Sequence, residues 1–209
     1  MITESNAYFT VPHQFNVYLE TWPESKGIPT EEDLRSMQSV GLKLLSEVKE
    51  LESSCLLQLR SLDNDAKAVV DFLKLQSRKV DLVLHHVLEK EVQTGERFSG
   101  THFGGSGINL SSDTPLNVGD YYKTSIYISS ELVAILCLCQ VTQCQKVDHG
   151  AALIEESQSD SKSHTNLFNI SLEFSQILDA DVEQLVKASL NVQQKMLKMR
   201  KQSRQQAAD

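Results

Sequence analysis

The stretch FSGTHFGGSGINLSSD, residues 98–113, packs glycines together and then returns to alternating apolar residues. These positions are Gly104, Gly105, Gly107, Ile108 and Leu110. Alternation with a period of two indicates a half-buried strand, and clustered glycines allow a sharp turn or a close approach by another group. The stretch therefore predicts two strands joined by a tight corner. The corner is either a ligand loop or only a turn.

Further strands surround this corner. Short alternating segments separated by SSDTP, VGD, KVDHG and QSDSKSH predict an α+β protein with a small six-stranded antiparallel barrel or sandwich. The expected strands are 97–103, 106–112, 121–129, 132–144, 150–156 and 166–175. The segment LVAILCLC is apolar on both faces, so we expect it to be covered on both sides, with a helix as the outer cover.

The N-terminal region predicts one more strand. Residues 9–19 alternate, with apolar residues at most odd positions, and Pro12 favours an edge strand because proline lacks a backbone N–H. We expect residues 1–29 to form a strand and loop that pack on the barrel.

Two heptad patterns precede the barrel. The first runs from Leu34 to Leu62 and follows Thr30, a good N-cap because three acidic residues come next. The second runs from Ala66 to Val87, with Gln76 as its polar exception. Apolar residues every 3.5 positions are typical of a coiled-coil seam. The expected oligomer interface is Leu73, Gln76, Val80, Val83 and Val87.

Periodicity alone leaves two interpretations of these helices open. They can form a self-associating bundle, in which Gln76 is a polar layer that fixes register and subunit number, or they can pair as a hairpin within one chain. A third amphipathic helix is expected within 178–209. Its end, KMLKMRKQSRQQAAD, is basic, which suits either the helix dipole or a contact with nucleic acid or membrane.

Composition narrows the function classes. The 209 residues carry a formal net charge of -8, which disfavours nucleic acid as a partner for the whole molecule. The first 20 residues lack the features of a signal peptide, and no apolar run is long enough to span a bilayer. We therefore expect a cytoplasmic protein without membrane insertion.

The sequence shows no catalytic or metal-binding constellation. His85 and His86 lie in a predicted helix without a carboxylate at metal-ligand spacing, and Ser106 lacks the context of a nucleophile elbow. Cys137 and Cys139 are expected on one face of a strand and Cys144 on the other, as buried free thiols together with Cys55. We expect no enzymatic activity, no metal and no cofactor.

Three ordered pieces of the chain resemble the PilZ domain, a six-stranded barrel of bacterial cyclic di-GMP signalling. They are THFGGSGINLSSDTPLNVGDYYKTSIYI, AILCLCQVTQC and NISLEFSQI. The flanking segments LKLQSRKVDLVLHHVL and DADVEQLVKASLNVQQKML resemble atypical PilZ proteins with long extra helices, some of which form tetramers through a helical bundle. The expected division is 1–29, the helices 30–91, the barrel 92–177 and the C-terminal helix with its basic tail, 178–209.

The resemblance also implies where a nucleotide would bind. Family members that bind cyclic di-GMP carry RxxxR before the barrel and [D/N]xSxxG at the first corner. Here Gly107 matches the last glycine of this second motif. His102 stands where the motif has Asp or Asn, and Gly104 stands where it has Ser. Neither Arg97 nor Arg78 has a second arginine four residues on. The degenerate site is Arg78, Arg97, His102, Gly104, Ser106 and Gly107.

Two functions follow from this resemblance. The first is a non-enzymatic, oligomeric PilZ-type adaptor in cyclic di-GMP signalling or motility, with weak or lost nucleotide binding and an unidentified signalling or motility protein as partner. The second is a genuine cyclic di-GMP receptor with a non-standard site at Arg97, His102, Lys90 or Arg78.

Overall fold

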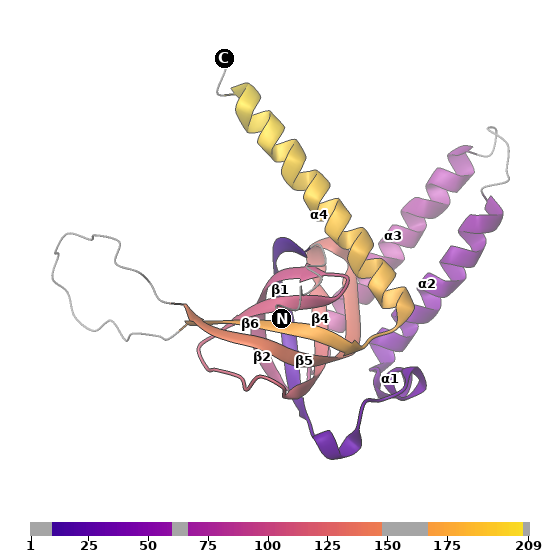
Figure 1. The fold of residues 1–209 in the computed structure, drawn as a ribbon. Helices are drawn as coiled ribbons and strands as arrows, with labels where there is room; N and C mark the ends of the chain where they lie inside the picture. The colour runs from indigo at the N-terminus through magenta and orange to yellow at the C-terminus, as the bar shows by residue number, and fades with distance from the viewer. Residues whose placement is uncertain (1–9, 60–66, 148–166, 207–209) are drawn as a thin grey trace, which may run out of the picture.

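The computed structural model describes residues 10–59, 67–147 and 167–206. Six antiparallel strands close into a barrel in the order β1-β2-β3-β6-β5-β4 (Figure 1). The strands are β1 (Thr10–Trp22), β2 (Glu96–Gly104), β3 (Gly107–Ser112), β4 (Tyr121–Ile128), β5 (Val133–Val147) and β6 (Leu167–Gln176). The predicted α+β fold with a six-stranded barrel is confirmed.

The N-terminal strand corrects the predicted domain division. β1 does not lie on the barrel; it pairs with β2 on one side and β4 on the other and thereby closes it. Pro12 is tolerated because it pairs only with β2, while pairing with β4 begins at Asn16. The edge position predicted from Pro12 therefore applies only to the part of β1 before Asn16. The strand expected at 150–156 lies outside the described residues.

A bulge in β5 overturns one prediction about the cysteines. Cys137 and Cys139 share the inward face, as predicted, but the register shifts between Val141 and Gln143. The extra residue reverses the alternation, so that Cys144 packs against the same core rather than facing outward. Cys55 is exposed on a helix, and it was expected to be buried.

The barrel has an apolar interior and a second apolar layer outside β5. Ala134 and Leu136 point outward from β5 and are still buried, because they pack against Leu42, Leu45 and Leu88 of the helices. The prediction that LVAILCLC is covered on both faces is confirmed. The outer layer is Leu42, Leu45, Leu88, Tyr127, Ala134 and Leu136, with Tyr18, Met37 and Leu84 packed against it.

The first heptad pattern forms two helices rather than one. A 3-10 turn (η1, Glu24–Lys26) precedes α1 (Glu31–Met37), and α2 follows at Val40–Leu59. Thr30 caps α1 as predicted and forms a capping box with Asp33. Gln38 is extended, with φ -62° and ψ 143°, so the chain leaves the helix before α2 begins. The pattern continues through this break because both helices pack on the same barrel face.

α2 and α3 (Lys67–Lys90) pair as an antiparallel hairpin whose base rests on the outer face of β1, β4 and β5. Gly41 allows the two helices to cross closely. A Cβ there would lie 2.7 Å from Leu88 Cδ2 and 2.6 Å from Glu91 Oε1. Away from this base the hairpin extends from the barrel as an arm (Figure 1).

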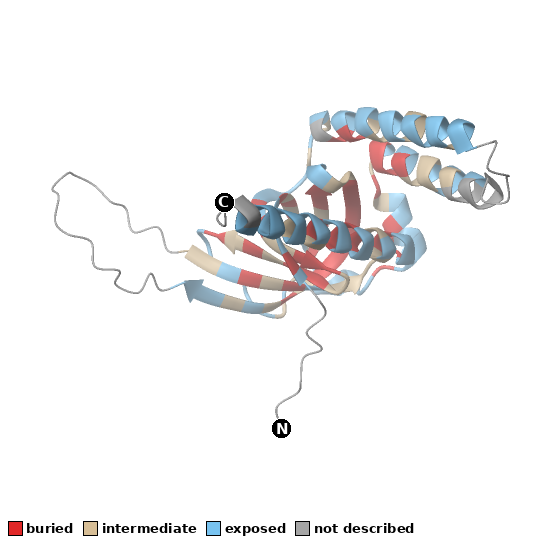
Figure 2. Cartoon of the chain, turned by 90° about the horizontal axis from the view of Figure 1, so that it is seen from above, coloured by how far each residue is buried: buried red, intermediate tan, exposed pale blue. Residues whose placement is uncertain are grey.

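α4 (Asp179–Gln206) crosses one end of the barrel (Figures 1 and 2). Leu185, Ala188 and Val192 belong to the barrel core. Lys195 Nζ donates to Glu131 Oε1 at 2.6 Å, in the 3-10 turn η3 (Ser129–Glu131) between β4 and β5. Every described side chain from Leu197 to Arg204 is exposed, so the helix continues into solvent as a second arm.

Candidate interaction surface and ligand site

One stripe of α3 makes the hairpin contact. Leu84 and Leu88 pack in the outer apolar layer, and the Ser77 hydroxyl donates to Glu52 Oε1 of α2 at 2.5 Å. These residues follow one another at intervals of seven and four, so they share one helical face. The intrachain hairpin, one of the two interpretations left open, is therefore present.

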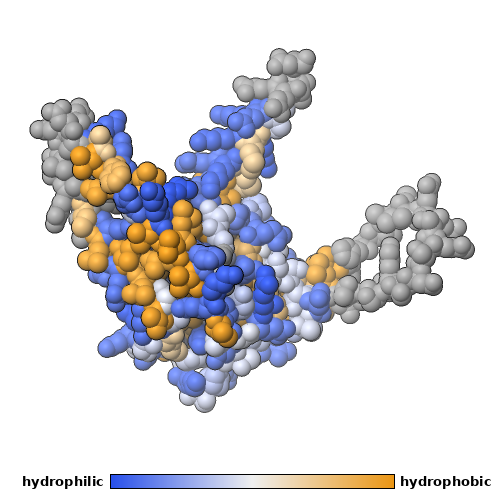
Figure 3. Space-filling model, turned by 180° about the vertical axis from the view of Figure 1, so that it is seen from behind, coloured by the Kyte–Doolittle hydropathy of each residue, from blue (hydrophilic) through white to orange (hydrophobic). Residues whose placement is uncertain are grey.

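The predicted seam lies on a neighbouring face of α3 and is not used by the hairpin. Leu73 is 43% exposed, Val80 44%, Val83 63% and Val87 47%, while Gln76 is half-buried. Figure 3 shows hydrophobic side chains gathered over the hairpin arm. The two interpretations are thus compatible, because different faces of one helix serve them. The oligomer interface itself stays a prediction.

A partly buried polar cluster, with Asp181 as its buried member, connects the hairpin with α4 and the barrel. We call it the polar joint: Lys49 and Glu52 of α2, Asp81 of α3, and Asp181 and Gln184 of α4. Lys49 Nζ donates to Gln184 Oε1 at 2.5 Å and to the Leu132 carbonyl at 3.4 Å. Burial lowers the pKa of Lys49, opposed by the nearby carboxylates of Asp81, Asp181 and Glu52. Three helices and the start of β5 therefore meet at one ammonium group.

Two carboxylate oxygens of the polar joint lack hydrogen-bond partners among the described residues. Asp181 is 4% exposed, and its Oδ2 has no hydrogen-bond partner; Asp81 Oδ1 also lacks one. Burial raises the pKa of Asp181 to about 6, against the opposing effect of Lys49. Burial and Glu52 raise the pKa of Asp81, again opposed by Lys49. The joint thus holds carboxyl groups that ionise at an energetic cost near neutral pH.

Sequence reasoning missed the polar joint. Its members lie on separate helices, and only the packing of α2, α3 and α4 brings them together. One signal was available: Asp81 lies four residues after Ser77 and seven before Leu88, on the stripe that faces α2. A charged residue on a packed stripe indicates a buried partner.

The glycine corner lies beneath α4 and beside β6. A Cβ on Gly105 would lie 3.0 Å from Val186 Cγ2 of α4, and one on Gly107 would lie 2.3 Å from the Leu172 carbonyl oxygen. The Ser106 carbonyl accepts the Phe174 N–H at 2.9 Å. The chain's own packing thus accounts for these glycines, and Gly104 is buried at the end of β2.

The other candidate ligand residues are on two different elements. Arg97 and His102 lie on β2; Arg97 Nη2 donates to Asn16 Oδ1 at 2.8 Å, and His102 Nδ1 is 3.2 Å from Thr101 Oγ1. Arg78 lies on α3, ten residues before Leu88, roughly 15 Å further along the arm. Arg78 and Arg97 therefore do not belong to a single RxxxR-like clamp.

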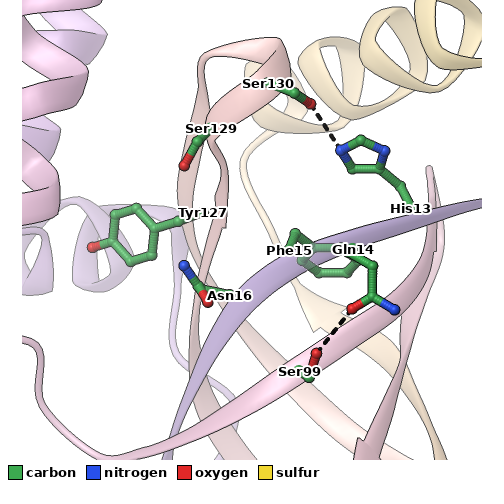
Figure 4. Close-up of a pocket in the computed structure, with 8 residues that line it drawn as sticks. All are labelled: His13, Gln14, Phe15, Asn16, Ser99, Tyr127, Ser129 and Ser130. Atoms are coloured by element: carbon green, nitrogen blue, oxygen red, sulfur yellow. Dashed lines mark hydrogen bonds between the residues drawn. The ribbon is translucent and has the colours of Figure 1, made fainter.

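A pocket of about 220 Å³ (Figure 4) includes Asn16, whose side chain accepts the hydrogen bond from Arg97. His13 is 2.8 Å from the Ser130 hydroxyl, and the Ser99 hydroxyl donates to Gln14 Oε1 at 3.1 Å. Partial burial, opposed by Glu131, lowers the pKa of His13. The pocket is lined by His13, Gln14, Phe15, Asn16, Ser99, Tyr127, Ser129 and Ser130. It offers hydroxyl, amide and imidazole groups that can hydrogen-bond a polar ligand.

His85, Cys137 and Cys139 serve packing. His85 is 3% exposed, with Nε2 3.3 Å from the Val133 carbonyl, whereas His86 is exposed. Cys137 Sγ lies 3.6 Å from Cys139 Sγ inside the barrel. Within residues 10–59, 67–147 and 167–206, no group of three or more histidine, cysteine or acidic side chains is arranged to hold a metal ion. In the same residues, no helix is both long and apolar enough to cross a bilayer.

The closed barrel with helices before and after it is the architecture that the PilZ resemblance implied. No family model and no curated protein matches the chain. A solved protein from Xanthomonas campestris, described as a new tetrameric PilZ domain self-assembled through an unusual helical bundle, is 9% identical with a TM-score of 0.48, over 92% of this chain and 91% of its own.

MrkH, described as a c-di-GMP-dependent transcription regulatory factor, is 16% identical with a TM-score of 0.35, over 49% of this chain and 43% of its own. Both similarities lie below 25% identity and below a TM-score of 0.5. The proposals for this chain therefore rest on its own residues and geometry.

Proposed function

We propose that this chain is a non-enzymatic, oligomeric PilZ-type regulatory protein of bacterial cyclic di-GMP signalling or motility. It assembles through the exposed seam of α3 and acts by binding a signalling or motility protein, with nucleotide binding weak or lost. The PilZ-like sequence signature and the closed barrel support the class. The substituted corner and the separated arginines support the loss of nucleotide affinity.

The observation that carries this proposal is the exposure of the α3 seam. Val69, Leu73, Val80, Val83 and Val87 recur at intervals of three and four around Gln76, and each of these apolar residues is at least 43% exposed. Burial of a large aliphatic side chain is worth about 1.5–3 kcal/mol, so a partner helix on this face gains substantial free energy. A second copy offers the same seam, as a bundle of identical helices requires.

Sedimentation of the full chain tests the assembly. We expect the wild-type protein to be an oligomer at micromolar concentration and the variant Val80→Lys with Val83→Lys to be a monomer, because two ammonium groups would be buried without partners. The variant should keep its helical circular dichroism, since both residues are exposed in the single chain.

A matched control variant distinguishes loss of the seam from a general loss of exposed hydrophobic surface on α3. Leu75 and Leu82 are each 51% exposed on α3, seven residues apart and off the seam. Leu75→Lys with Leu82→Lys makes the same change of charge, and the oligomer should survive it. A monomeric wild-type protein, or equal effects of the two double variants, would contradict the proposal.

A second candidate function, a cyclic di-GMP receptor with a non-standard site, is favoured by the surroundings of Arg97. Its guanidinium is exposed and donates to Asn16, which also lines the polar pocket with Ser99. An arginine beside hydroxyl and amide groups can hold a phosphate.

Isothermal titration of the full chain with cyclic di-GMP tests this candidate. Micromolar binding that weakens at least tenfold in Arg97→Ala, but not in Arg200→Ala on α4, would establish the receptor. If cyclic di-GMP at hundreds of micromolar produces no heat, the receptor function is excluded and the adaptor function stands.

A further inference from the structure

From Gln184 onward, α4 carries a charge that the rest of the molecule does not share. From Gln184 to Gln206 there are six lysines and arginines and no acidic residue. The chain has a net charge of -8, so all other residues together carry -14, the difference between -8 and +6. The helix dipole favours cations only within the last turn, where Arg204 lies. Apart from Lys195, which pairs with Glu131, the bases from Lys187 to Lys201 therefore need another explanation.

The same part of α4 also exposes an apolar stripe. Leu190 and Leu197 are 49% and 51% exposed and lie seven residues apart, which places them on one face of α4. Val186, at the start of this stripe, lies against the glycine corner and is 42% exposed. This face is separate from the one that enters the barrel core through Leu185 and Val192. Lys201 and Arg204 continue the exposed face, and Lys198 and Arg200 flank it.

We propose that the α4 arm lies on the surface of a membrane that contains anionic phospholipid. A helix with leucines on one face, bases beside them and no acids is typical of segments that rest at the lipid–water interface. The long lysine and arginine side chains reach the headgroups while the leucines enter the acyl boundary. Nucleic acid would match the charge but leave Leu190 and Leu197 in water.

The shape of the molecule permits this contact despite its net negative charge. Residues 197–204 are all exposed and extend the helix by roughly 12 Å past its contact with the barrel. This length exceeds the Debye length of about 8 Å at physiological salt, so the negative charge on the rest of the molecule is largely screened from a surface that the tip touches. Figure 1 shows the arm pointing away from the barrel.

Flotation of the full chain with vesicles tests the proposal. We expect it to float with vesicles of equal parts phosphatidylcholine and phosphatidylglycerol but not with phosphatidylcholine alone. Each base near an anionic surface contributes about fivefold in affinity. Replacing Lys198, Arg200, Lys201 and Arg204 with glutamine should therefore lower binding several hundredfold.

Two further variants distinguish lipid from other partners. Replacing Lys67, Lys74, Lys79 and Lys90 of α3 with glutamine makes the same change of net charge and should leave flotation intact. Leu190→Gln with Leu197→Gln should weaken it about tenfold. Circular dichroism confirms that each variant keeps its helices.

Three results would overturn the proposal. They are failure of the wild-type chain to float with the anionic vesicles, an equal loss in the α3 variant, and undiminished binding by the leucine variant. The last result would mean that the contact is electrostatic only, as with nucleic acid or an acidic protein.

Discussion

Asp181 shows at the residue scale how burial makes stability depend on pH. Its carboxyl has a pKa of about 6 in the folded chain against an ordinary value of 3.8, because it is buried with one unpartnered oxygen. The folded state therefore holds its proton more tightly than the unfolded state. The stabilisation from this group is complete below pH 4 and is lost as the pH rises through about 6.

Asp181→Asn should remove this pH dependence. At pH 8 we expect the variant to be more stable than the wild type by up to about 3 kcal/mol, and at pH 4 to differ little. Urea unfolding at the two pH values measures the difference. Asp179→Asn, at an exposed position in the same turn, is the control and should change stability by less than about 0.5 kcal/mol at either pH. A destabilised Asp181→Asn at pH 8 would show that attraction to Lys49 outweighs burial.

At the scale of elements, the crossing of α2 and α3 depends on Gly41. Its N–H donates to Glu91 Oε1 at 3.0 Å, and the Ser39 hydroxyl donates to Glu91 Oε2 at 2.7 Å, so the Glu91 side chain is held from two sides. Leu88, the other neighbour, is fully buried. Neither group can move away from an added methyl group without losing contacts.

Gly41→Ala should therefore lower the free energy of unfolding by about 1–2 kcal/mol, since overpacking outweighs the better helix propensity of alanine. Chemical denaturation measures the change. Gly41→Ala combined with Glu91→Ala should recover part of the loss by removing one of the two clashes. An unchanged or increased stability of the single variant would mean that the helices separate freely, and that the crossing is not tightly packed.

Individual strands and helices also show which structural features a local sequence pattern can predict. The corner after Phe103 and the alternation of β3 and β6 were predicted correctly, because period-two burial depends on neighbouring residues. The sequence pattern did not predict the helix break at Gln38 or the bulge near Thr142. The heptad spacing continues across Gln38, and the bulge is set by pairing of β5 with β6, so neither leaves a local signal.

On the scale of the whole molecule, Lys49 connects the two arms to the barrel. It reaches Gln184 of α4 and the Leu132 carbonyl before β5 while it belongs to the hairpin. It also lies near Asp81, Asp181 and Glu52, whose charges oppose the effect of burial on its pKa. Among the described residues, its removal would leave Asp181 with only Arg35, and Asp81 with only His85 and Arg78, as nearby positive groups.

Lys49→Met should make the loss of stability between pH 5 and pH 8 larger than in the wild type by about 1–2 kcal/mol, since Asp181 holds its proton at pH 5 but not at pH 8. The direction of this pH dependence follows from Asp81 and Asp181. Without Lys49 their pKa values in the folded chain rise further, so stability falls more as the pH increases. Thermal unfolding at both pH values measures this. Lys43→Met on the exposed side of α2 is the control, and an equal effect of the two variants would contradict a central role for Lys49.

The amino-acid sequence by itself determined the class of fold, the glycine corner, the doubly covered strand β5 and the heptad face of α3. These features follow from the spacing of apolar residues and glycines within short segments of the chain. Only the tertiary structure decided that β1 closes the barrel, that α4 covers the glycine corner, and that Lys49, Asp81 and Asp181 meet. Strand pairing and helix docking join residues far apart in the chain, and their geometry depends on how whole elements pack.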